Sequence, residues 1–253
     1  CNECIQGMLQ SSDRLAEIGS IASLGRMEEG GTKGKRITKR ASNKLPAKGK
    51  ILAGCYIDFE GFAGNEYQMS PPPVLIGIYR DGEFKQVVFT EKYRWAAEQA
   101  GVDHEVSFHT DRITFLKELA ASVSASKPLF GYTEHELAVI EKLLGHKITK
   151  RYRNARAIAN RWFNKHGDLY QKPKTFALVD VAMSLGVTLD AKLPKGGVTS
   201  RLRSVGNYSS SKRKWESAPP SVRREWQEVL EHNRFDVMSM LEILSFMRRE
   251  RGE

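Results

Sequence analysis

The sequence has few cysteines, no long apolar run and, over three segments, no acidic residue. Only 3 cysteines occur in 253 residues. That is too few for a disulfide framework, so we expect a reducing compartment and a cytoplasmic protein. No uncharged apolar run approaches the ~20 residues of a membrane-spanning helix, and no signal-peptide pattern opens the chain. The sequence therefore predicts a protein with no membrane partner.

The first residues contain a Cys-x-x-Cys pair, Cys1 and Cys4, with no second pair downstream. Such a pair is half of a zinc or iron–sulfur site at most, and two ordinary reduced cysteines are the alternative. Because the chain begins with Cys1 rather than Met, we expect that residues precede it. An upstream domain or a partner protein is then the natural source of further ligands.

Acidic residues are absent from three basic segments, and the formal net charge is +10. Residues 33–50, 147–165 and 192–214 each carry several Lys and Arg but no Asp or Glu. A polyanion such as DNA or RNA suits three separate basic segments. A solvated surface is the alternative, and it explains one such segment more easily than three.

The hydrophobic pattern divides the chain into three parts. Residues 1–29 have moderate helical periodicity and would suit the tail of an upstream domain. Residues 30–50 are basic and contain glycine, which predicts a flexible linker. We expect the folded domain to begin near Ile51 and to include residues 51–253.

Within 51–253, strands come first and helices then alternate with one further strand, which predicts an α/β domain with a mixed sheet. Asp81-Gly82 between two apolar runs predicts a hairpin turn. The predicted strands are 51–60, 74–79, 84–89 and 128–132. Predicted helices follow the cap at Thr110-Asp111 and the acids near Glu136, and others cover 147–165, 176–185 and 221–249. Residues 190–217 are predicted to be loop, with a short helix near 200–205.

Two carboxylates stand one residue apart at the end of the first predicted strand, in Ile57-Asp58-Phe59-Glu60. Side chains two apart on a strand point to the same face. Two like charges on a buried strand repel each other and are costly to desolvate. A divalent cation held by carboxylate oxygens would offset that cost. A half-exposed edge strand with an acidic outer face is the alternative.

Acids also occur at two later predicted elements. Glu134 and Glu136 follow the strand near Phe130, where a favourable interaction with the helix dipole is the alternative explanation. His232 and Asp236 lie four apart on one face of the last helix. Carboxylates from three elements can hold two Mg²⁺ or Mn²⁺ ions about 3.5–4 Å apart, which activate a water and stabilise a leaving oxygen. A histidine can take the proton of that water at neutral pH.

In this order the three motifs resemble those of the DEDD-type 3′–5′ exonucleases of the ribonuclease H-like superfamily, from about 51 to 249. The likeness is to a branch of predicted nucleases sometimes found behind a cysteine-containing RecB-like domain. The matching segments are 57–60, 130–136 and 231–237. The resemblance implies a ribonuclease H-like mixed sheet flanked by helices. It also implies that two Mg²⁺ or Mn²⁺ ions are held by four carboxylates, those of Asp58, Glu60, Glu136 and Asp236.

The same resemblance implies that His232 positions or deprotonates the water. Two positions depart from the family pattern. Glu136 stands where most of the superfamily has Asp. His232 precedes Asp236 by four residues, which is the spacing of the tyrosine-type branch, whereas the histidine-type branch has its His where Glu231 stands. These departures leave open a catalytically weak nucleic-acid-binding or assembly module on the same fold.

The function predicted from these motifs is hydrolysis of phosphodiester bonds in DNA or RNA by a two-metal 3′–5′ exonuclease acting on a single strand or 3′ end. A structure-specific endonuclease is a further alternative. Basic residues between the second and third motifs lie where a substrate strand would pass. The predicted nucleic-acid contacts are Arg201, Arg203, Lys212, Arg213 and Lys214. Three aromatic residues are candidates for base stacking, with core packing as the alternative: Trp162, Tyr208 and Trp215.

Overall fold

The computed structural model describes residues 44–62, 72–187, 197–210 and 217–250. The predicted segment 1–29 lies outside these residues, as does most of the predicted linker 30–50. Helix α3 (Lys48–Leu52) begins inside the predicted linker. Ile51 is therefore helical, and the prediction that a strand begins there was wrong. The Ile51 side chain is buried, and its carbonyl accepts a hydrogen bond of 2.8 Å from the Tyr56 hydroxyl, which holds α3 against the sheet.

A mixed sheet of six strands forms the centre of the domain, which confirms the α/β prediction. The strand order is β4-β3-β2-β1-β5-β6. The pairs β1–β2 and β2–β3 are antiparallel, whereas the pairs β3–β4, β1–β5 and β5–β6 are parallel. The strands are β1 (Cys55–Glu60), β2 (Leu75–Arg80), β3 (Glu83–Val88), β4 (Val106–Phe108), β5 (Leu129–Gly131) and β6 (Tyr152–Asn154).

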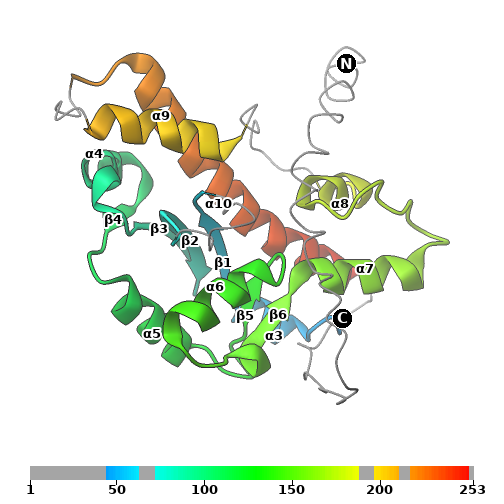
Figure 1. The fold of residues 1–253 in the computed structure, drawn as a ribbon. Coiled ribbons are helices and arrows are strands. Elements are labelled where there is room, and N and C mark those ends of the chain that lie inside the picture. Colours follow the sequence, from blue (N-terminus) through cyan, green and yellow to red (C-terminus); the bar gives the residue numbers. More distant parts are fainter. Residues whose placement is uncertain (1–43, 63–71, 188–196, 211–216, 251–253) are drawn as a thin grey trace, which may run out of the picture. The chain divides into compact units, whose positions relative to one another are not determined.

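Helices cover both faces of this sheet (Figure 1). The longest, α10, runs across one face from α9 toward α7 and α8. Among the described residues, no helix is both long and apolar enough to cross a bilayer. After α3, the helices are α4 (Arg94–His104), α5 (Arg112–Ser122), α6 (His135–Leu144), α7 (Ala155–His166), α8 (Leu178–Ser184), α9 (Val198–Ser210) and α10 (Pro220–Arg249), with short 3₁₀ turns η2 (Glu91–Tyr93) and η3 (Thr149–Arg151).

Local sequence signals account for several of these elements. Asp81 and Gly82 both have positive φ angles, 53° and 90°, as the predicted hairpin turn requires. The Asp111 side chain accepts a hydrogen bond from the Thr114 amide and caps α5 as predicted.

Other boundaries differ from the prediction. Residues 147–165 are not one helix, because Tyr152 lies in β6, where it pairs with β5. Helix α9 is longer than the predicted 200–205 segment, and α4 and β4 were not predicted.

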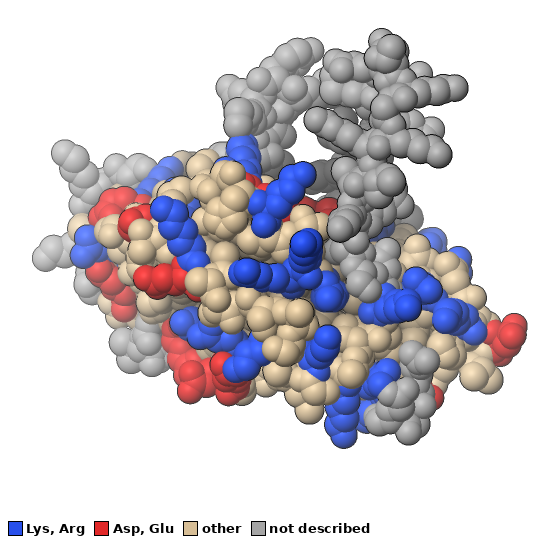
Figure 2. Space-filling view, turned by 90° about the horizontal axis from the view of Figure 1, so that it is seen from below, with Lys and Arg blue, Asp and Glu red and all other residues tan. Residues whose placement is uncertain are grey.

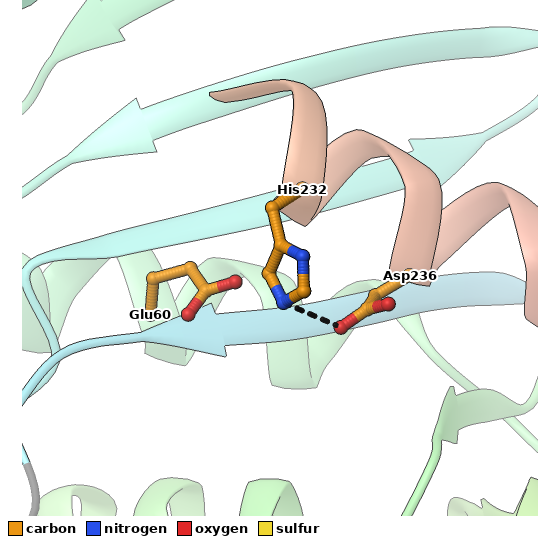
Figure 3. Close-up of side chains that lie close together, drawn as sticks. All are labelled: Glu60, His232 and Asp236. Carbon is orange, nitrogen blue, oxygen red and sulfur yellow. Dashed lines mark ion pairs between the residues drawn. The ribbon is translucent and has the colours of Figure 1, made fainter. Parts of the chain in front are cut away.

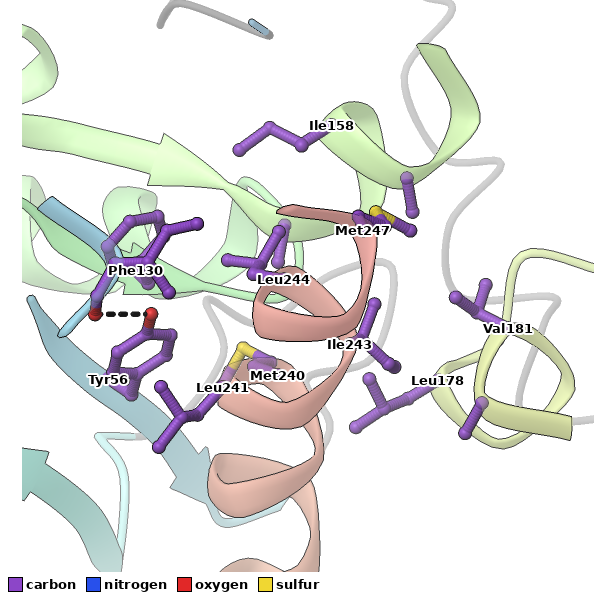
Figure 4. Close-up of a cluster of buried hydrophobic side chains, with 14 of the residues drawn as sticks. Tyr56, Phe130, Ile158, Leu178, Val181, Met240, Leu241, Ile243, Leu244 and Met247 are labelled. Atoms are coloured by element: carbon purple, nitrogen blue, oxygen red, sulfur yellow. Dashed lines mark hydrogen bonds between the residues drawn. The ribbon is translucent and has the colours of Figure 1, made fainter. Parts of the chain in front are cut away.

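The alternation of β1 decides which residues reach which face. Ile57 packs in a cluster with residues of α5 and α6, whereas Tyr56 packs in a cluster with residues of α10. Figure 4 shows Tyr56 and Phe130 beside Leu241 and Leu244 of α10. Because side chains alternate along a strand, Asp58 and Glu60 share the α10 face with Tyr56.

Helix α10 joins two apolar clusters with a polar interval between them. Trp226 and Leu230 belong to the cluster with α4 and α9, whereas Met240 and Leu244 belong to the cluster shown in Figure 4. Between the two clusters, Asn233 is fully buried. A Cβ on Gly77 of β2 would lie 2.1 Å from Asn233 Oδ1, so α10 approaches the sheet closely only because residue 77 is glycine.

We expect Gly77→Ala to lower the free energy of unfolding by about 1–3 kcal/mol, as overpacked core substitutions do. Gly49→Ala is the matched control, since Gly49 lies in helix α3 and has no atom within 4 Å of an added Cβ. That control should leave stability unchanged or slightly raised. Urea unfolding measures both variants, and equal stability of the two would contradict this account of the α10 contact.

Candidate metal centre

Asp58 of β1 is held by hydrogen bonds from Asn233 of helix α10. The Asn233 amide donates from Nδ2 to the Asp58 carboxylate at 3.0 Å and to the Asp58 carbonyl oxygen at 3.1 Å. The register places Asp58 opposite Gly77, beside the residue that leaves room for Asn233. The carboxylate is therefore fixed by a neutral donor rather than by a cation.

Gln86 of β3 orients that amide. Its Nε2 donates to Asn233 Oδ1 at 3.0 Å and to the Leu230 carbonyl at 2.9 Å. Since Oδ1 accepts from Gln86, Nδ2 of Asn233 is the end that faces Asp58. Neither Gln86 nor Asn233 was predicted from the sequence to belong to a site. The available signal was a polar residue at a core position, because Gln86 alternates with the buried Phe84 and Val88.

Glu136 lies at the start of α6 and is 5% exposed, whereas Glu134 is exposed. Oε2 of Glu136 accepts hydrogen bonds from the amide and the hydroxyl of Thr133, both at 3.1 Å. The Tyr152 hydroxyl lies between the Thr133 carbonyl and Oε2, 3.2 Å from the latter. Oε1 takes part in none of these hydrogen bonds. Gly131 makes this packing possible, since a Cβ there would lie 2.2 Å from the Tyr152 hydroxyl.

Glu60, His232 and Asp236 meet at the end of β1 (Figure 3). One ligand atom from each lies within 4.8 Å of the others. His232 Nε2 is 3.5 Å from Asp236 Oδ2. His232 and Asp236 come from successive turns of α10, and both side chains are partly exposed. The structure thus brings residues together that are more than 170 positions apart in the sequence.

Burial raises the pKa of Asp58 well above its ordinary value of 3.8, and it raises the pKa of Glu60 well above 4.5. Negative charge on three neighbours raises the pKa of Asp58 further, in the order Glu60, Asp236, Glu136, whereas the hydrogen bond from Asn233 lowers it. Burial likewise raises the pKa of Glu136 and of Asp236. Four carboxylates from β1, α6 and α10 therefore act on one another in a partly desolvated space.

No Lys or Arg in the described part of the chain forms an ion pair with these four carboxylates. Among the described residues the positive partners of these carboxylates are histidines, since His232 lowers the pKa of Asp236 and His135 lowers the pKa of Glu136. Mg²⁺ and Mn²⁺ prefer oxygen ligands, and Mn²⁺ also accepts imidazole. Two oxygens on opposite sides of one Mg²⁺ are ~4.2 Å apart at bond lengths of 2.0–2.1 Å. The ligand atoms of Glu60, His232 and Asp236, which lie within 4.8 Å of one another, therefore fit such an ion.

The predicted nucleic-acid contacts are not brought together in this way. Arg201 is 7% exposed and forms an ion pair of 2.6 Å with Glu228 that joins α9 to α10, so a surface phosphate contact does not suit it. Arg203 is exposed. Lys212, Arg213, Lys214 and Trp215 lie outside the described residues.

The other aromatic candidates for base stacking are buried. Trp162 is 3% exposed and stacks on His166 with ring centroids 4.5 Å apart, which is core packing. Tyr208 is 9% exposed, and its hydroxyl is 3.2 Å from Ser217 Oγ.

Comparison with known proteins finds no family model that matches this chain and no curated protein similar to it.

The carboxylates predict an inverse pH dependence of stability in the metal-free protein. Because their pKa values are raised on folding, the folded state keeps protons that the unfolded chain releases. The free energy of unfolding therefore falls as pH rises above the ordinary values of 3.8 and 4.5. Each unit of raised pKa costs about 1.4 kcal/mol once the group ionises. We expect a lower Tm in EDTA at about pH 8 than at about pH 6, and Mn²⁺ should restore it.

Asp58→Asn isolates this effect, since an amide oxygen still accepts from Asn233 while the charge is gone. The variant should raise the Tm of the metal-free protein at about pH 8 and shrink the shift that Mn²⁺ produces. Asp81→Asn is the control, because Asp81 is exposed at the hairpin turn and its left-handed conformation suits Asn. A lower Tm for Asp58→Asn than for Asp81→Asn would show that the charge at residue 58 stabilises the fold.

Proposed function

We propose that this domain is a metal-dependent nuclease that hydrolyses phosphodiester bonds in DNA or RNA. The observation that carries the proposal is the meeting of Glu60, His232 and Asp236, whose ligand atoms lie within 4.8 Å of one another, with Asp58 and Glu136 near enough to affect the pKa of Glu60. No Lys or Arg among the described residues forms an ion pair with the four carboxylates. A protein gains no stability from burying like charges together. Their arrangement is understandable if divalent cations complete it.

The four carboxylates would hold the ions, with Asp58 kept in place by Asn233 and Glu136 by Thr133 and Tyr152. When bound there, two divalent ions supply an activated water and stabilise the leaving oxygen. His232 takes the proton of the attacking water, since its imidazole lies beside Glu60 and Asp236 and histidine is the side chain most often used as a general base. It then returns the proton to solvent through its partly exposed side.

A ribonuclease H-like fold and 3′–5′ exonuclease activity are the finer parts of the proposal. They follow from the resemblance of the three motifs. Support comes from the mixed sheet flanked by helices and from the placement of the motifs on β1, at the start of α6 and on α10. A substrate with a free 3′ end is thus the first choice for an assay.

Purified protein with Mg²⁺ or Mn²⁺ should shorten a single strand labelled at its 5′ end, and Asp58→Asn should reduce cleavage to background. Asp81→Asn should retain full activity, because Asp81 is exposed in the turn at the end of the sheet where β1 begins, whereas Glu60 lies at the other end of β1. DNA, RNA and closed circular DNA are compared in parallel, and cutting of the circle would indicate an endonuclease. If neither ion supports cleavage of any of the three while Mn²⁺ still stabilises the protein, the nuclease proposal fails.

His232→Ala should lower kcat by about 10²–10⁴-fold, the usual contribution of a general base, and leave the Mn²⁺-induced rise in Tm intact. Glu231→Gln is the adjacent control. It changes the exposed position at which the histidine-type branch has its His, and it should leave kcat unchanged. Loss of the Mn²⁺ response in His232→Ala would instead make His232 a metal ligand.

A further inference from the structure

A group of basic side chains lies outside the carboxylate site, in the connection from α6 to β6. This connection is held rigidly. The Glu141 carboxylate accepts hydrogen bonds from the amides of Ile148 and Thr149, at 2.8 and 3.0 Å, and from the Thr149 hydroxyl at 2.7 Å. Ile148 is buried, and Gly145 ends α6 with a φ of 69°. The one acid of this region is thus engaged with the backbone.

The same connection forms one wall of a cavity of about 280 Å³, and α5 forms the other. The lining residues are Lys117, Ala120, Ala121, His146 and Arg151. Arg151 donates from Nη1 to the Ala120 carbonyl at 3.0 Å. The guanidinium is therefore positioned at the cavity wall, and among the described residues its other N–H groups have no hydrogen-bond partner.

Positive charge continues along the α6–β6 connection and into α7. No Asp or Glu occurs in residues 142–167, and Lys147 and Lys150 lie within the connection. Lys117, Lys147 and Lys150 are exposed and form no ion pair within the described residues. Figure 2 views the domain from the side of α5 and the start of β6, and it shows Lys and Arg across the middle of that face.

This surface is remote from the carboxylates. Helix α6 begins beside Glu136 and ends at Gly145, and its 10 residues span about 15 Å. The parallel strands β5 and β6 likewise start near the basic connection and run toward the site. A ligand in the cavity therefore does not touch the candidate metal ligands.

We propose that the cavity between α5 and the α6–β6 connection, with Lys117, Lys147, Lys150 and Arg151, binds phosphates of a nucleic-acid backbone as a second contact surface. Fixed guanidinium groups and unpaired ammonium groups are the donors that proteins use for backbone phosphates. No Phe, Tyr or Trp lines the cavity, and its charged groups are suited to phosphates, so we expect a contact to the backbone that is independent of base sequence. The choice of nucleic acid as ligand rests on the proposed function, but binding here requires no metal.

The test is fluorescence anisotropy of a labelled single-stranded oligothymidylate in EDTA over a series of salt concentrations. The triple variant Lys117→Gln, Lys147→Gln, Lys150→Gln should bind about tenfold more weakly. Its plot of log affinity against log salt should be shallower by about 2, because each lost phosphate contact removes about 0.7 on a single strand. The control exchanges three exposed lysines elsewhere, Lys85→Gln, Lys92→Gln and Lys172→Gln, and should change the slope much less.

Equal slopes for the triple variant and the control would overturn the proposal. So would inorganic phosphate or a mononucleotide that competes as well as the oligonucleotide, since the cavity would then be a small-molecule site. The nuclease assay is read separately. Metal-dependent cleavage with unchanged slopes would reject the surface alone, whereas a slope change without cleavage by any variant would reject the nuclease alone.

Discussion

The side-chain amide of Asn233 joins helix α10 to the middle of the sheet. It donates both to the backbone and to the carboxylate of Asp58, and Gln86 determines which end of the amide faces β1. An unpaired buried amide would cost about 1–3 kcal/mol, so α10 has little freedom to slide or rotate. Because Asp236 lies almost one turn further along α10, the same contact sets where that carboxylate meets Glu60. The position of the helix and the geometry of the site are one constraint.

Apolar packing on both sides maintains that constraint. The clusters around Trp226 and around Leu244 hold α10 down at two places, and the polar interval lies between them. The burial of these apolar clusters thereby offsets the free-energy cost of desolvating the four carboxylates. Such an arrangement trades stability for a pre-organised site, as functional centres commonly do.

The sequence was informative where short-range rules decide the structure. Period-two alternation put Asp58 and Glu60 on one face, and the Asp81-Gly82 turn and long α10 followed from local signals. It was uninformative where a distant partner decides. Tyr152 fitted the apolar stripe of a predicted helix, but it lies in a strand because it pairs with β5. Arg201 was predicted to contact nucleic acid at the surface, but it is paired with Glu228. The roles of Gln86 and Asn233 could not be predicted from the sequence, because they depend on β3, α10 and β1 lying next to one another.

The contact between β1 and α10 can form only late in the synthesis of the chain. Asp58 and Asn233 are 175 residues apart, so at about 5–20 residues per second a ribosome adds the second some 9–35 s after the first. Throughout that interval the acidic face of β1 has no cover and its carboxylates remain hydrated. The carboxylates of β1 and α10 can therefore meet only after translation has delivered α10.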